Sequence, residues 1–130
     1  MKQEKILLVD DEEIILETVG DDLREAGFNV VKANNGAEGL RQFKASEFDL
    51  VISDLMMDEM DGFGVLREVK RISPATPVII ITGYPSSKAA KEALILGASE
   101  IIIKPSGLQE IFKVISRQMG LSKKESDRKP

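Results

Sequence analysis

The sequence predicts a single α/β domain in which a parallel β-sheet is covered by helices on both faces. Its short β-branched runs are nearly continuous in apolar residues, which is typical of strands buried on both faces of a parallel sheet. Segments with helical spacing separate these runs, and such alternation favours parallel strands joined by right-handed crossovers. The length of 130 residues is within the usual size range of a single domain.

Each element follows from the order of apolar residues along the chain. Five strands are predicted at residues 6–9, 30–33, 50–53, 78–81 and 101–103. Five helices are predicted from apolar stripes, whose members are Leu16, Val19, Leu23 and Ala26; Ala37, Leu40 and Phe43; Phe63, Leu66 and Val69; Ala90, Ala93 and Leu94; and Leu108, Ile111, Phe112, Ile115 and Met119.

Capping signals agree with these helices. Two pairs have the spacing of a capping box, and they are Asn35 with Glu38 and Ser106 with Gln109. Glycines that follow a stripe, where a left-handed C-cap is expected, are Gly27, Gly97 and Gly120. Gly20 lies inside the first predicted helix, where it lowers helix stability, and the local sequence gives no reason for it.

Composition excludes several classes of function. The chain contains neither cysteine nor histidine, which excludes disulfides, thiolate sites and every catalytic scheme that needs an imidazole. The net charge of −4 argues against nucleic acid as a direct ligand. The apolar runs are too short to cross a bilayer and no signal-peptide pattern is present, so a cytoplasmic protein is expected. Residues 1–121 are predicted to form the domain, and the polar residues 122–130 a tail or the start of a linker.

Polar side chains follow four of the predicted strands at the point where each strand ends. Asp10 and Asp11 follow the first strand, Asp54 the third, Thr82 the fourth and Lys104 the fifth. The carboxyl ends of parallel strands lie at one edge of the sheet, where open α/β folds bind their ligands. The sequence therefore predicts that three carboxylates, a hydroxyl and an ammonium group meet at one site.

The predicted site suits a divalent cation and a phosphoryl group. Carboxylates that lie close together repel one another unless a cation or protons intervene. Carboxylate oxygens suit Mg²⁺, and no soft ligand is present to favour zinc or copper. A phosphoryl group on one carboxylate would need its oxygens neutralised by that cation and by a lysine, with a hydroxyl as a further donor.

Each of these residues has a plainer interpretation when it is taken alone. Asp10 and Asp11 could be a helix N-cap pair, and Asp54 could start a loop ahead of a turn. Thr82 and Lys104 could simply end their strands. Their joint occurrence at one edge of the sheet, in the right strand order, favours the phosphoryl site.

Four motifs resemble the response regulator receiver family over roughly residues 5–119. They are ILLVDDEE at 6–13, DLVISDLMMDEMDGFGVL at 49–66, VIIITGY at 78–84 and IIIKPSGL at 101–108. The resemblance implies a flavodoxin-like (βα)5 sandwich whose parallel sheet has the strand order 2-1-3-4-5. It also implies that Asp54 is the phosphoacceptor. Asp11, Asp54 and the backbone carbonyl of Met56 would hold Mg²⁺, and Asp10 would act mainly through metal-bound water.

The resemblance further implies a signalling switch. A sensor histidine kinase or phosphotransfer protein would donate the phosphoryl group. Lys104 would contact the phosphoryl oxygens and Thr82 would move to meet them. The face of the fourth helix, fifth strand and fifth helix would then change, to control a partner or output domain or to form a homodimer. The domain would assist its own phosphorylation and dephosphorylation without being a conventional enzyme.

Departures from the family pattern leave two other classes open. Asp58 stands where proline is usual, Ile101 where an aromatic residue usually couples threonine movement to the output face, and Ser106 where phenylalanine is frequent. A receiver fold that docks a partner without phosphorylation is one alternative. A phosphotransferase of the haloacid-dehalogenase kind is another, but that family has a second aspartate two residues after its nucleophile, and this chain has Glu12 two residues after Asp10. A flavin carrier is disfavoured because no Ser/Thr-rich phosphate loop or Gly-rich fingerprint is present.

Overall fold

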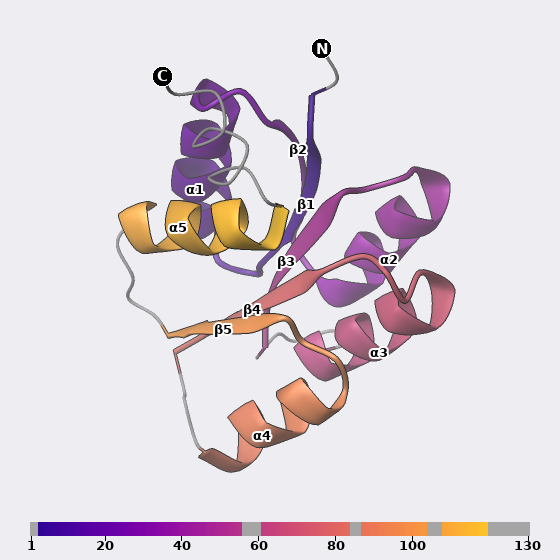
Figure 1. Cartoon of the computed structure of the whole chain (residues 1–130). Helices are drawn as coiled ribbons and strands as arrows, with labels where there is room; N and C mark the ends of the chain where they lie inside the picture. Colours follow the sequence, from indigo (N-terminus) through magenta and orange to yellow (C-terminus); the bar gives the residue numbers. More distant parts are fainter. Residues whose placement is uncertain (1–2, 56–60, 84–86, 104–107, 120–130) are drawn as a thin grey trace, which may run out of the picture.

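The computed structural model describes residues 3–55, 61–83, 87–103 and 108–119, in which five strands alternate with five helices (Figure 1). The strands are β1 (Lys5–Val9), β2 (Asn29–Ala33), β3 (Leu50–Asp54), β4 (Val78–Thr82) and β5 (Glu100–Ile103). The helices are α1 (Glu13–Glu25), α2 (Gly36–Ala45), α3 (Gly62–Ile72), α4 (Ser87–Ile95) and α5 (Leu108–Met119). All ten elements were predicted, and each strand is one residue longer than its predicted range.

The strands form one parallel sheet in the order β2-β1-β3-β4-β5, which confirms the predicted topology. Successive side chains of β1 enter two separate cores: Leu7 and Val9 lie in one, and Ile6 and Leu8 in the other. Helices α2, α3 and α4 cover the first face, and α1 and α5 cover the second (Figure 1). Burial on both faces explains why the strand sequences are continuously apolar.

The helix ends confirm most of the predicted capping signals. The Asn35 side chain accepts a hydrogen bond of 2.8 Å from the Glu38 N–H at the start of α2. Gly27 and Gly97 adopt φ values of 105° and 110°, the left-handed conformation in which glycine is favoured. The predicted caps at Ser106 and Gly120 and the polar tail lie outside the described residues.

Three of the described members of the predicted apolar stripes are exposed, and they are Ala26, Ala37 and Leu94. Leu94 is the largest of them. Ala93 of α4 is fully buried, but Leu94 is exposed. Adjacent helical residues point about 100° apart, so a narrow helix contact can bury only one of the two. Here the residue that faces the sheet is Ala93, the smaller of the two.

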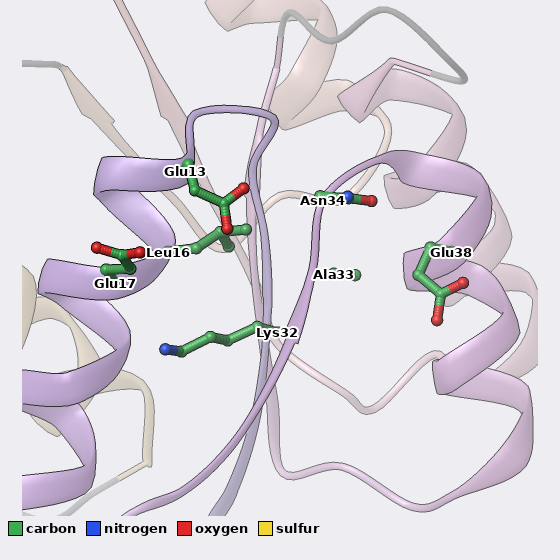
Figure 2. Close-up of a pocket in the computed structure, with 7 residues that line it drawn as sticks. All are labelled: Glu13, Leu16, Glu17, Lys32, Ala33, Asn34 and Glu38. Atoms are coloured by element: carbon green, nitrogen blue, oxygen red, sulfur yellow. The ribbon is translucent and has the colours of Figure 1, made fainter.

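The structure supplies a reason for Gly20. A Cβ atom at Gly20 would meet the end of the Lys32 side chain, which extends from β2 toward α1 (Figure 2). The Lys32 ammonium pairs with the Asp21 carboxylate at 3.2 Å. The same lysine lines the pocket of Figure 2, whose other residues are Glu13, Leu16, Glu17, Ala33, Asn34 and Glu38.

Replacing Asn35 by Ala is expected to lower the free energy of unfolding by about 1 kcal/mol, because the Glu38 N–H loses its cap. Urea unfolding followed by circular dichroism measures this change. Asn34→Ala is the matched control, since Asn34 is exposed and precedes the cap. Equal stability of the two variants would show that the cap contributes nothing measurable.

Within the described ranges, none of the helices combines the length and the apolar character that crossing a bilayer requires.

Candidate functional site

Three of the predicted site residues lie together at the carboxyl edge of the sheet because of the strand register. Val9 of β1 pairs with Ser53 of β3, so the residues that follow them, Asp10 and Asp54, come level on neighbouring strands. Asp54 in turn pairs with Ile81 of β4, and Thr82 comes next on that strand. Asp10 and Asp54 are only 1% and 5% exposed, and Thr82 is buried as well.

Two of these residues belong to a group of three carboxylates. One carboxylate oxygen each from Asp10, Glu12 and Asp54 lies within 4.8 Å of the others. Asp10 and Asp54 are buried, and Glu12 is exposed. Two of the three carboxylates that were predicted to meet are therefore grouped, and the third member is Glu12, which the sequence did not single out for metal binding, and not Asp11.

The turn after β1 explains the place of Glu12. The Asp10 carboxylate accepts a hydrogen bond of 2.9 Å from the Glu12 N–H. Glu12 is the N-cap residue of α1 and has extended dihedral angles (φ −91°, ψ 112°). This bond spans a bend at Asp11 and holds Glu12 beside Asp10, while the Asp11 side chain between them is exposed. The role of Asp11 as a metal ligand stays a prediction.

The backbone that carries Asp54 is held by three neighbouring groups. The Leu55 N–H donates to the Ile81 carbonyl at 3.1 Å, and the Gly62 N–H donates to the Leu55 carbonyl at 2.8 Å. The buried Ser53 hydroxyl donates to the Asp54 carbonyl at 3.0 Å. These bonds fix the end of β3 against β4 and against the start of α3.

Two predicted site residues, Met56 and Lys104, lie outside the described residues. So do Asp58, Ser106 and Tyr84. The described part of β5 ends at Ile103, which pairs with Thr82 of β4. The roles predicted for Met56 and Lys104 stay predictions.

The donor set suits a hard divalent cation. Three carboxylates so close together, two of them buried, need a positive partner or protons to offset their repulsion. Carboxylate oxygens are the ligands that Mg²⁺ accepts, often together with water and one backbone carbonyl. The third member, Glu12, is exposed, so a cation bound by this group would have access to water ligands.

Comparison with known proteins decides the family. The sequence model of the response regulator receiver domain matches residues 6–116. The chain belongs to this family. Membership selects the receiver over the haloacid-dehalogenase-like and flavin-carrier interpretations, and it accounts for the flavodoxin-like topology.

Individual relatives agree with this receiver assignment. The transcriptional regulatory protein ZraR of Escherichia coli strain K12 is 45% identical over 114 residues, which cover 88% of this chain and 26% of ZraR. A CheY-like receiver domain structure from Methanospirillum hungatei has a TM-score of 0.90 and 28% identity, covering 95% of this chain and 99% of that one. A CheX–CheY–BeF3–Mg²⁺ complex from Borrelia burgdorferi has a TM-score of 0.83 and 26% identity, covering 88% and 87%.

The receiver domain spans about a quarter of the length of the curated relatives it matches.

Proposed function

We propose that this receiver domain is a phosphorylation-controlled switch that takes a phosphoryl group on Asp54. The donor would be a phosphohistidine on a sensor histidine kinase or a phosphotransfer protein. The observation that carries the proposal is the buried Asp54 carboxylate at the carboxyl edge of the sheet, grouped with Asp10 and Glu12 within 4.8 Å. Membership of the receiver family supports it independently.

The proposed reaction is a simple transfer. A carboxylate oxygen of Asp54 attacks phosphorus, the P–N bond of the phosphohistidine breaks, and the imidazole leaves with the electron pair and takes a proton from solvent. With acetyl phosphate a P–O bond breaks and acetate leaves. Water later attacks the acyl phosphate, which returns the Asp54 carboxylate and inorganic phosphate. Positioning and charge neutralisation account for the domain's part in both steps.

Mg²⁺ is the proposed cofactor. Asp11, Asp54 and the Met56 carbonyl would hold it, with Asp10 acting through water, and the position of Glu12 makes that residue a further candidate. The ion would supply positive charge to the phosphoryl oxygens. The Borrelia complex named above contains Mg²⁺ and BeF3 with a related receiver fold, which supports this choice of cation.

The switch would use Thr82 and Lys104. The Thr82 hydroxyl at the end of β4 is buried next to the strand that carries Asp54, so only a short movement would bring it to a phosphoryl oxygen. The Lys104 ammonium would pair with another oxygen. Both contacts require the added charge, so they would bias the domain toward a second conformation. Ile101 is partly buried against the α2–α3–α4 core and has no aromatic ring to report this movement.

Incubation with acetyl phosphate and Mg²⁺, followed by intact-mass measurement, tests the proposal. We expect a gain of one phosphoryl group that disappears when a chelator removes Mg²⁺. A chain that gains no mass from acetyl phosphate and none from a phosphorylated kinase would instead be a docking module without phosphorylation.

The proposed output surface is formed by α4, β5 and α5. Among its described residues, the apolar side chains of Leu94, Ile95 and Ile103 are exposed, which suits docking of a partner or of a second copy. The curated relatives are named as transcriptional regulatory proteins, so control of transcription, through an output domain or a separate partner, is the output we propose. The proposed location is the cytoplasm, where both the kinase domains of sensor histidine kinases and Mg²⁺ are available.

Replacing Ile95, which is 78% exposed, by Ser is expected to weaken phosphorylation-dependent dimerisation about tenfold. Loss of one buried aliphatic side chain costs about 1.5–3 kcal/mol, and 1.4 kcal/mol is about tenfold in affinity. Sedimentation velocity of phosphorylated protein measures the dissociation constant. Ile72→Ser on α3, away from this surface, is the control. A phosphorylated wild-type domain that stays monomeric would leave partner docking as the use of this surface.

A further inference from the structure

Gly62, the first residue of α3, lies unusually close to the backbone at the end of β3. A Cβ atom built at Gly62 would come within 2.6 Å of the Leu55 Cα and closer still to the Asp54 carbonyl oxygen. These are backbone atoms in a strand end that is itself hydrogen-bonded to β4, so they cannot move aside as a side chain can. A residue with a side chain at position 62 therefore requires either α3 or the Asp54–Leu55 peptide to shift.

The reason for glycine at this position is the close approach and not the backbone conformation. Gly62 is helical, whereas the positive φ angles of the described residues belong to Gly27 and Gly97. Gly20 differs in another way, since its missing Cβ faces only the flexible end of Lys32. Among these glycines, Gly62 is the one packed against the backbone of the site.

Gly62 contacts the peptide unit between Asp54 and Leu55, whose orientation sets the direction of the Asp54 side chain. The Gly62 N–H donates to the Leu55 carbonyl at 2.8 Å, and the Leu55 N–H donates to Ile81 of β4 at 3.1 Å. From the other side, the Ser53 hydroxyl donates to the Asp54 carbonyl at 3.0 Å. Helix α3, strand β4 and Ser53 thus hold the two peptide units that follow Asp54 in one orientation.

We propose that Gly62 is a positioning residue for Asp54. Because Gly62 has no side chain, the first turn of α3 closes onto the end of β3 and holds the Asp54 carboxylate in its group with Asp10 and Glu12. The proposal rests on the proposed function, in which that group binds Mg²⁺ and Asp54 takes the phosphoryl group. Ser53 serves the same peptide through its hydroxyl, with a smaller effect.

Gly62→Ala tests the proposal, with two matched variants. Gly20→Ala makes the same chemical change where only the Lys32 side chain must move. Val69→Ala removes part of a fully buried side chain from the same helix and lowers stability through a cavity, far from the carboxylates. All three are compared in the Mg²⁺ dissociation constant, the labelling rate with acetyl phosphate, and amide hydrogen exchange of Leu55 and Gly62 without metal.

For Gly62→Ala we expect a labelling rate about tenfold lower, since a misplacement of about 1 Å can cost up to about 100-fold. We also expect weaker Mg²⁺ binding and faster exchange of the residue 62 N–H than in the wild type. Val69→Ala should lose stability but keep the wild-type Mg²⁺ affinity and labelling rate. Gly20→Ala should keep the wild-type Mg²⁺ affinity, labelling rate and amide exchange. This pattern separates positioning from a general loss of stability.

Wild-type Mg²⁺ affinity and wild-type amide exchange in a folded Gly62→Ala protein would overturn the proposal, as would an equal loss of Mg²⁺ affinity in Val69→Ala. If Gly62→Ala does not fold, Ser53→Ala replaces it, because it removes a donor to the same peptide without adding an atom. Unchanged Mg²⁺ affinity and labelling rate in Ser53→Ala would then overturn the proposal. A wild-type domain that takes no phosphoryl group would contradict the proposed function. Mg²⁺ affinity and amide exchange would still test whether Gly62 positions Asp54.

Discussion

Replacing Asp54 by Asn is expected to reduce phosphoryl uptake from acetyl phosphate to background. The side chains have nearly the same shape, and the Asp54 site is buried, so the fold is retained. The amide oxygen is a poor nucleophile, however, and it cannot form the acyl phosphate that a carboxylate forms. The change also removes one negative charge from a group of three, which weakens binding of Mg²⁺. Intact-mass measurement after incubation with acetyl phosphate and Mg²⁺ gives the result directly.

Asp49→Asn is the matched control for this prediction. Asp49 immediately precedes β3, at the opposite end of the strand from Asp54, where its carboxylate accepts a hydrogen bond from the Lys5 N–H at 2.8 Å. An amide oxygen can accept the same bond, so this variant should be labelled like the wild type. Persistent labelling of Asp54→Asn would contradict the assignment and direct attention to Asp10 and Asp11 as acceptors.

The place of Asp54, Asp10 and Thr82 could be predicted from the sequence because it depends on topology. Strands buried on both faces must be continuously apolar, so the first polar residue after each run marks the strand end. Once the strands are parallel, all these ends lie at one edge. The observed register then brings Asp10 and Asp54 level, with Thr82 one residue further along β4.

Features that depend on local geometry could not be predicted in the same way. The inclusion of Glu12 in the carboxylate group depends on the bend at Asp11 and on the hydrogen bond from the Glu12 N–H to the Asp10 carboxylate, although the spacing of two from Asp10 was an available signal. The burial of Ala93 in place of Leu94 depends on how α4 rotates against the sheet. Gly62 follows Asp61 in a common turn pair, and nothing in the sequence indicates that it contacts the backbone of Asp54.

Replacing Asp10 by Asn is expected to change two properties in opposite directions. Two unit charges within 4.8 Å of each other repel by about 3.5 kcal/mol or more at an effective dielectric constant of about 20. The predicted Lys104 ammonium would offset part of this repulsion, so we expect stability without Mg²⁺ to rise by about 1 kcal/mol. Because the same charge attracts the cation, we expect the Mg²⁺ dissociation constant to rise at least roughly tenfold and labelling at limiting Mg²⁺ to slow by a similar factor.

Urea unfolding in the presence of a chelator and isothermal titration with Mg²⁺ measure the two properties separately. The side-chain amide oxygen of the Asp10→Asn variant can still accept the hydrogen bond from the Glu12 N–H, so the turn before α1 is preserved and the charge is the main change. Loss of stability together with unchanged Mg²⁺ affinity would show that Asp10 is a structural cap and not part of a cation site.

Asp11→Asn and Glu12→Gln extend the same two measurements to two candidate metal ligands. The family resemblance implies Asp11, whereas the geometry groups Glu12 with Asp10 and Asp54. Both side chains are exposed, so neither change should alter metal-free stability as much as Asp10→Asn. The family resemblance leads us to expect the larger loss of Mg²⁺ affinity for Asp11→Asn. A larger loss for Glu12→Gln would show that the ion is held by the carboxylate that the turn after β1 brings next to Asp10 and Asp54.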